Sequence, residues 1–118
     1  MWQDLTVASA NSDASSPLLD DHARDGALEL MKYGLKEAQR EKVVTKGELY
    51  VNPQVVTATP KEVKLRDCVD GTGWLQYKLN GTLKNDVPGS HFKADARVLR
   101  NGTVWKVSYL YIHEAGTC

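Results

Sequence analysis

Residues 21–42, "DHARDGALELMKYGLKEAQREK", carry the strongest helical pattern in the chain. Small or apolar residues recur at spacings of three and four, which places them in one stripe along an α-helix. The members of this stripe are Ala23, Ala27, Leu30, Met31, Gly34, Leu35 and Ala38. Acidic residues precede the stripe and basic residues crowd its end, as the helix dipole favours. The sequence therefore predicts a long amphipathic helix over about residues 20–41, which needs an apolar surface to pack against.

From Val43 onward the apolar period shortens from about 3.6 residues to 2, which indicates β-strands. Residues 43–60 read as strand, turn and strand, and residues 61–70 and 73–81 each add a further strand. Residues 85–91, "NDVPGSH", are predicted to form a loop.

Residues 92–112 are typical of a long antiparallel hairpin in which Asn101-Gly102 forms a two-residue type I′ turn. Strict alternation in the second arm predicts one large aromatic face, made of Trp105, Val107, Tyr109 and Tyr111. A sheet with one apolar face needs a cover, and the amphipathic helix can provide it. With a shorter helix predicted over residues 1–11, the fold class is α+β. N-terminal helices pack on a curved antiparallel sheet of four or more strands, in a cone-shaped roll.

Length and charge limit the class of protein. The chain has 118 residues, enough for one core, so residues 1–118 are predicted to form a single domain. Lys and Arg together number 15, as do Asp and Glu, and this balance argues against nucleic-acid binding. No apolar run approaches the length of about 18 residues that a membrane-spanning helix needs. No signal peptide is visible, although a chain trimmed of its leader would look the same.

Two cysteines, Cys68 and Cys118, bear on the cellular compartment. Their separation fits neither a redox CxxC pair nor a zinc knuckle. His22, His91 and His113 complete no metal-binding spacing, so the sequence predicts no metal site and no cofactor. A structural disulfide is the simplest use of the two cysteines, and two free thiols in a cytosolic protein are the alternative. A disulfide would indicate an oxidising, extracytoplasmic location.

A series of short motifs extends over almost the whole chain in a specific order and spacing. They are "MWQDL" (1–5), "SPLLDDHARDGALELM" (16–31), "YGL" (33–35), "VTKGE" (44–48), "NPQVV" (52–56), "VKLRDCVDGTGWLQYK" (63–78), "VPG" (87–89), "TVWKV" (103–107) and "GTC" (116–118). In these motifs the chain resembles an uncharacterised family of actinobacterial secreted proteins and predicted lipoproteins.

The resemblance implies a nuclear transport factor 2-like, or cystatin-like, fold, with a cavity between helix and sheet. It also implies that Cys68 pairs with Cys118, and that the domain follows an N-terminal leader or anchor, so that the protein is secreted or membrane-anchored. It brings no catalytic residues to carry over.

Enzymes of this fold use an Asp or His base and a Tyr donor inside the cavity. The residue types are present at Asp67, Asp95, His91, Tyr77 and Tyr109, but no spacing singles them out, so we assign no catalytic residue. Asp67 can instead hydrogen-bond neighbouring backbone, the Asp70-Gly71 pair favours a turn, and His91 is expected in solvent. Residues 54–58, "QVVTA", match the QxVxG hairpin of protease-inhibiting cystatins only loosely, because Ala58 replaces the glycine.

The aromatic residues of the predicted strands are the candidate ligand or partner surface. They are Trp74, Tyr77, Trp105, Tyr109 and Tyr111. Such residues in a small domain also form the core, and this alternative stays open.

The sequence favours an extracytoplasmic, non-catalytic binding or interaction module of the cell envelope. Its expected partner is another envelope protein or a small apolar ligand. The alternative is a small-molecule cavity enzyme of the isomerase or dehydratase kind, which would need an ionisable group inside an open pocket.

Overall fold

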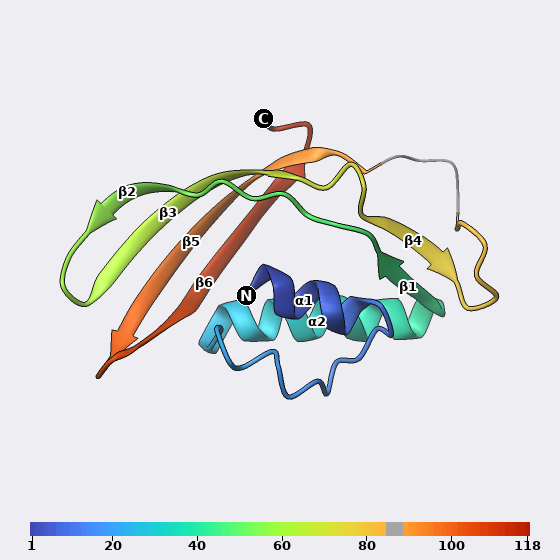
Figure 1. Cartoon of the computed structure of the whole chain (residues 1–118), viewed down its shortest axis with the longest axis horizontal. Helices are drawn as coiled ribbons and strands as arrows, with labels where there is room; N and C mark the ends of the chain where they lie inside the picture. The colour runs from blue at the N-terminus through green and yellow to red at the C-terminus, as the bar shows by residue number, and fades with distance from the viewer. Residues whose placement is uncertain (85–88) are drawn as a thin grey trace.

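Two helices lie against one face of a curved antiparallel sheet (Figure 1). The computed structural model describes residues 1–84 and 89–118, so most of the loop predicted over residues 85–91 and part of the "VPG" motif fall outside the described residues. The elements are α1 (Trp2–Ser9), α2 (Asp25–Glu41), β1 (Val43–Lys46), β2 (Gln54–Ala58), β3 (Glu62–Asp70), β4 (Leu75–Lys78), β5 (His91–Asn101) and β6 (Val104–Ala115). The predicted α+β class, with helices packed on antiparallel strands, is confirmed.

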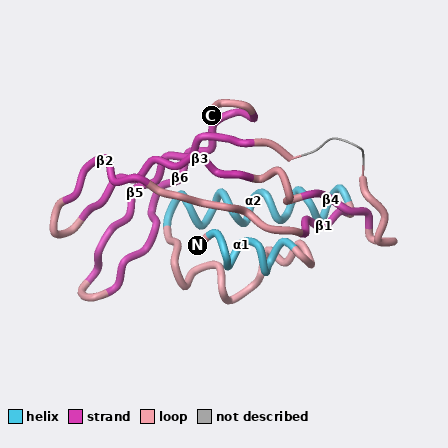
Figure 2. The backbone as a smooth tube through the Cα atoms, turned by 45° about the horizontal axis from the view of Figure 1, so that its top comes forward, coloured by secondary structure: helices cyan, strands magenta, loops and turns pink. Residues whose placement is uncertain are grey.

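The described strands form two sheets. The larger has the order β2-β3-β5-β6, and β1 pairs with β4 in a small two-stranded sheet beside it. The free ends of the β2–β3 and β5–β6 hairpins extend past the beginning of α2, as both views show (Figures 1 and 2). The helices therefore cover only part of the four-stranded sheet. No described helix has the length and apolar character needed to cross a membrane.

Helix α2 begins at Asp25, five residues later than predicted. Residues 22–24 instead run along β6, where Ala23 forms a parallel bridge with Val107. The Val107 N–H donates to the His22 carbonyl (2.9 Å), and the Arg24 N–H donates to the Val107 carbonyl (2.8 Å). The backbone of these residues thus bonds to the sheet, which is incompatible with helical i to i−4 bonding.

The core lies between α2 and the middle of the sheet. Most of the predicted stripe is buried, whereas Leu30 and Gly34 at its margin are exposed. The buried residues of the cluster are Leu5, Ala8, Ala14, Leu19, Ala23, Ala27, Met31, Leu35, Val69, Ala94 and Leu110. Leu19 and Val69 are fully buried, so the segment before α2 closes the core from one side and β3 from the other.

The predicted aromatic face of β6 is wrong because the strand contains a β-bulge. The register pairs Val98 with Val107 but Arg97 with Tyr109, so Ser108 is an extra residue. The bulge shifts the alternation by one residue, and both Val107 and Leu110 pack against the core on the helix side. Trp105 shares the face of Val107, whereas Tyr109 and Tyr111 lie on the opposite face. The sequence prediction failed here because strict alternation assumes an unbroken ladder.

The β5–β6 hairpin is confirmed, but its turn lies one residue further along than predicted. Asn101 pairs with Val104, so Gly102 and Thr103 are the two loop residues. Gly102 has φ 66°, whereas Thr103 has no positive φ. Glycine in the first loop position with positive φ fits a type II′ turn better than the expected type I′.

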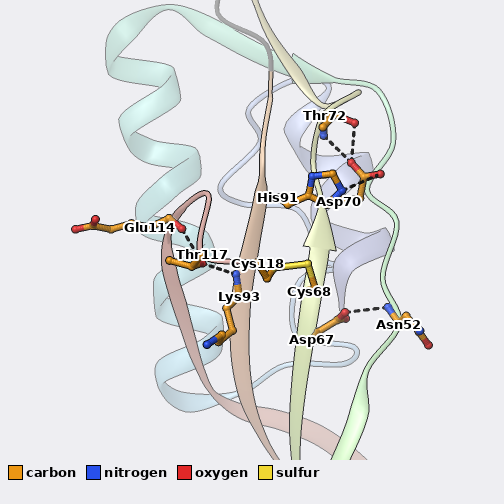
Figure 3. Close-up of a disulfide and its surroundings, with 10 residues drawn as sticks. All are labelled: Asn52, Asp67, Cys68, Asp70, Thr72, His91, Lys93, Glu114, Thr117 and Cys118. Atoms are coloured by element: carbon orange, nitrogen blue, oxygen red, sulfur yellow. Dashed lines mark hydrogen bonds and ion pairs between the residues drawn. A yellow bond between two sulfur atoms is a disulfide. The ribbon is translucent and has the colours of Figure 1, made fainter.

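The predicted disulfide between Cys68 and Cys118 is present, with the two Cα atoms 5.8 Å apart (Figure 3). Cys68 lies on β3 between the buried residues Asp67 and Val69, so its side chain points to the face turned away from the helices. The chain after β6 crosses β5 to reach it, where the Lys93 N–H donates to the Thr117 hydroxyl (2.8 Å). The disulfide therefore fixes the C-terminal segment across the sheet and indicates an oxidising compartment.

We expect Cys68→Ser to lower the free energy of unfolding by about 4 kcal/mol, because the bond closes a loop that spans 50 residues. Urea unfolding of the oxidised protein and of the variant measures the difference. Parent protein treated with a reductant is the control and should unfold at the midpoint of the variant. Equal midpoints for the oxidised parent and Cys68→Ser would contradict a stabilising role.

Candidate functional site

A cavity of about 440 Å³ lies between the helices and the sheet, and it is the principal candidate site. Its walls come from α1, α2, β1, β4 with the preceding Trp74, β5 and β6. The residues that line it are Trp2, Leu5, Ser9, Ser12, Leu30, Met31, Tyr33, Gly34, Leu35, Ala38, Thr45, Trp74, Gln76, Phe92, Leu110 and Ile112.

The lining of this cavity is apolar and aromatic. Its polar side-chain groups are neutral: the hydroxyls of Ser9, Ser12, Tyr33 and Thr45, the amide of Gln76 and the indole N–H groups of Trp2 and Trp74. None of the described lining residues is Asp, Glu, His, Lys or Arg. General acid–base chemistry needs an ionisable group within hydrogen-bond reach of the reacting atom, and the described part of the cavity offers no carboxylate or imidazole for it.

Two features bear on whether the cavity can hold a ligand. On α2, Leu30, Tyr33 and Gly34 all have exposed surface, so solvent reaches the cavity along this side of the helix. The indole Nε1 of Trp74 is buried without a hydrogen-bond partner among the described residues. A buried unpaired donor is costly, and such positions in native proteins call for an explanation.

The structure does not bring together the five aromatic residues predicted as a ligand or partner surface. Trp74 lines the cavity, and Tyr77, half-buried on β4, pairs with Val44 of the small sheet. Trp105 lies on the helix side near the end of the β5–β6 hairpin, whereas Tyr109 and Tyr111 are 47% and 52% exposed on the other face.

Sequence reasoning missed other residues of the cavity. Trp2, Tyr33 and Phe92 line it but were not part of the predicted surface. One sequence signal was available: Tyr33 extends the apolar stripe of α2 on the side of its members Leu30 and Gly34. The stripe is thus wider than the surface that the sheet covers.

Asp67 has the structural role that the sequence suggested. It is buried on β3, and its Oδ1 accepts a hydrogen bond from the Asn52 backbone N–H at 2.9 Å (Figure 3). This bond holds the chain between β1 and β2 against the edge of β3, where regular pairing is interrupted. Asp67 is not among the residues that line the cavity.

The end of β3 is a turn held by Asp70. Its Oδ1 accepts hydrogen bonds from the backbone N–H (3.0 Å) and hydroxyl (2.6 Å) of Thr72. These bonds lower the pKa of Asp70, and His91, 3.6 Å away, adds a smaller effect. His91 is exposed, as predicted, and the three residues lie together at the surface (Figure 3).

Asp95 belongs to a polar cluster on the sheet face opposite the cavity. Its Oδ2 lies 2.7 Å from His113 Nε2, and its Oδ1 accepts a hydrogen bond from Arg66 Nε at 2.8 Å. The bonds from His113 and then Arg66 lower the pKa of Asp95. This Asp–His pair is therefore separated from the cavity by the sheet. The described residues contain no group of three side chains placed to bind a metal ion.

Three solved structures resemble this chain at low sequence identity. The intermembrane space region of the chloroplast protein ARC6 superposes with a TM-score of 0.69 at 13% identity, covering 94% of this chain and 86% of that chain. A candidate aromatic ring hydroxylase from Novosphingobium aromaticivorans gives a TM-score of 0.58 at 16% identity, covering 93% and 83%. A candidate scytalone dehydratase from the same species gives 0.57 at 14% identity, covering 93% and 76%.

No protein-family model matches the chain, and no curated protein matches it either. These likenesses indicate a nuclear transport factor 2-like fold, which is the fold that the resemblance in the sequence implied. The comparisons give no support to the actinobacterial lipoprotein family. At these identities they establish the fold and not an activity.

We expect the free energy of unfolding of Asp95→Asn to fall less steeply at acidic pH than that of the parent protein. The folded-state pKa of Asp95 is lowered, so its ionised form stabilises the protein above the unfolded value of about 4. This contribution is lost as the pH falls through the lowered pKa, and the variant cannot lose it.

Urea midpoints of parent and variant, measured from neutral pH down to about pH 2, give the comparison. Asp70 also has a lowered pKa, so Asp70→Asn is the matched control. It should reduce the acid dependence of the free energy of unfolding independently of Asp95→Asn. Parallel curves for the parent and Asp95→Asn would show that the ionisation of Asp95 is not linked to folding.

Proposed function

We propose that this protein is a non-catalytic binding module that holds a small apolar ligand in the cavity between α2 and the sheet. The observation that carries the proposal is the cavity lining, which is aromatic and aliphatic with a few neutral polar groups. Binding sites for small molecules are typically of this kind, with volumes of about 300–1,000 Å³. The volume of about 440 Å³ suits a ligand of one or two rings or a short acyl chain.

A cavity enzyme of the isomerase or dehydratase kind is the alternative. The names of two structural neighbours favour it, but their identities of 14% and 16% support only a common fold. Asp67 Oδ1 accepts a hydrogen bond from Asn52, and Asp67 Oδ2 is buried without a partner among the described residues, but Asp67 does not line the cavity. The Asp95–His113 pair lies on the opposite face of the sheet. These placements favour binding over catalysis.

The proposed location is extracytoplasmic, in the cell envelope of an actinobacterium. The disulfide supports an oxidising compartment, and the motif series supports this family of secreted proteins and lipoproteins. A leader or lipid anchor ahead of the domain is part of the same proposal. A folded module with an open cavity could then take an apolar molecule from the membrane surface.

Gly34→Leu tests the cavity without endangering the fold. A Cβ at Gly34 meets no atom within 4 Å, so a leucine side chain has room at the cavity mouth. We expect binding of N-phenyl-1-naphthylamine, a neutral fluorescent probe, to be lost in this variant. The free energy of unfolding should rise by about 0.5–1 kcal/mol, because leucine favours the helix over glycine.

Two variants serve as controls. Gly34→Ala should gain helix stability and keep most of the probe binding, because a methyl group fills little of the mouth. Gly26→Ala alters α2 away from the cavity, with its Cβ in ordinary contact with the Ser108 carbonyl oxygen (3.6 Å), and should bind as the parent does. Parent-like binding by a folded Gly34→Leu protein, or no binding by the parent, would refute the cavity as the site.

A further inference from the structure

The outer face of the four-stranded sheet, the face turned away from the helices, carries a row of hydrogen-bond donors. The register pairs Thr57 with Lys64, Lys64 with Arg97 and Arg97 with Tyr109. Residues directly opposite each other lie on the same face with Cβ atoms about 5 Å apart. A hydroxyl, an ammonium, a guanidinium and a phenol therefore stand side by side across all four strands.

Two of these neighbours repel each other. Lys64 and Arg97 are like charges in directly opposed positions, an arrangement that destabilises a sheet. Neither has an ion-pair partner among the residues that the structure describes. An anion between them would turn this repulsion into two attractions.

In the adjacent row on the same face, cations and a carboxylate form ion pairs. It consists of Gln54, Arg66, Asp95 and Tyr111, and here the opposed charges are of opposite sign. Both carboxylate oxygens of Asp95 are occupied, one by Arg66 and the other by His113. Asp95 forms ion pairs with these two residues and, among the described residues, none with Lys64 or Arg97.

A hollow of about 390 Å³ lies over these two rows. Its side chains include Val56, Lys64, Arg66, Asp95, Arg97 and Tyr109. Val56 is 57% exposed at the bulge of β2 and gives the hollow an apolar margin beside its cations. Carboxylates and an apolar side chain of one ligand could thus be accommodated together.

Charge is distributed unevenly over the molecule. The net charge of the chain is zero, and the outer positions of β3 and β5 together hold four cations and three carboxylates. Two of the carboxylates, Glu62 and Asp70, lie at the ends of β3, so the cations gather in the middle of the face, where Asp95 is the one carboxylate of these two strands. Such a field attracts an acidic partner and suppresses basic ones. Arginine and tyrosine are also the residues that concentrate binding energy at protein interfaces.

We propose that this outer face binds an acidic segment of a partner protein, whose carboxylates lie between Lys64 and Arg97. The hydroxyls of Thr57 and Tyr109 extend the donor row on either side. The site is separate from the cavity, because the sheet lies between them, and it goes beyond the binding of an apolar ligand.

The experiment titrates the oxidised protein with an octaglutamate peptide and, in parallel, with an octaglutamine peptide, by NMR chemical shifts. We expect octaglutamate alone to bind, to perturb the amides of β3 and β5, and to weaken as salt is added. The double variant Lys64→Gln, Arg97→Gln should lose about tenfold in affinity, since each partly exposed charge pair contributes a factor of up to about five.

Matched variants separate the site from general charge effects. The double variant Lys32→Gln, Lys36→Gln removes the same amount of charge from α2. It should change the affinity for octaglutamate less than twofold. Gly34→Leu should bind octaglutamate as the parent does, so failure of the cavity proposal is distinguishable from failure of this one. The Tm of the double variant without peptide should equal or exceed that of the parent, which excludes unfolding as the cause of lost binding.

Three results would overturn the proposal. One is the absence of octaglutamate binding by the parent at low salt. Another is unchanged affinity in the folded double variant. The third is a protein that binds an acidic polysaccharide such as alginate but not octaglutamate, and whose double variant no longer binds the polysaccharide. That result would assign the face to glycans.

Discussion

The packing of α2 on one half of the sheet is the constraint on which the rest of the structure depends. The apolar stripe of α2 is wider than the surface that the sheet covers, so Leu30, Tyr33 and Gly34 stay exposed and the cavity keeps an open margin there. Both helices lie on one face of the sheet, which leaves the opposite face without any described cover.

The bulge at Ser108 makes this packing possible. By adding one residue to β6 it turns both Val107 and Leu110 toward the helix, while Tyr109 and Tyr111 point outward. Without that extra residue, the large aromatic side chains would have to fit where Leu110 now packs. The bulge therefore decides which residues line the cavity and which belong to the outer face.

Much of the fold could be predicted from periodicity alone, because α2, the β5–β6 hairpin and the turn at Asp70 are local features. The start of α2 could not be predicted in this way, since the backbone of His22 and Arg24 bonds to Val107, which is remote in the sequence. The same holds for the site: Trp74 was a candidate by type, but Trp2 and Phe92 join it only through tertiary packing. The cross-strand opposition of Lys64 and Arg97 likewise depends on register, which the sequence does not reveal without the turn and bulge positions.

The alignment of β3, β5 and β6 brings the two sulfur atoms together, although the cysteines are 50 residues apart in the sequence. The folded sheet therefore raises the effective concentration of one thiol at the other, and an oxidant has only to join two groups that already lie side by side. Both cysteines are exposed, so a thiol oxidase in solvent can reach the place where the bond forms.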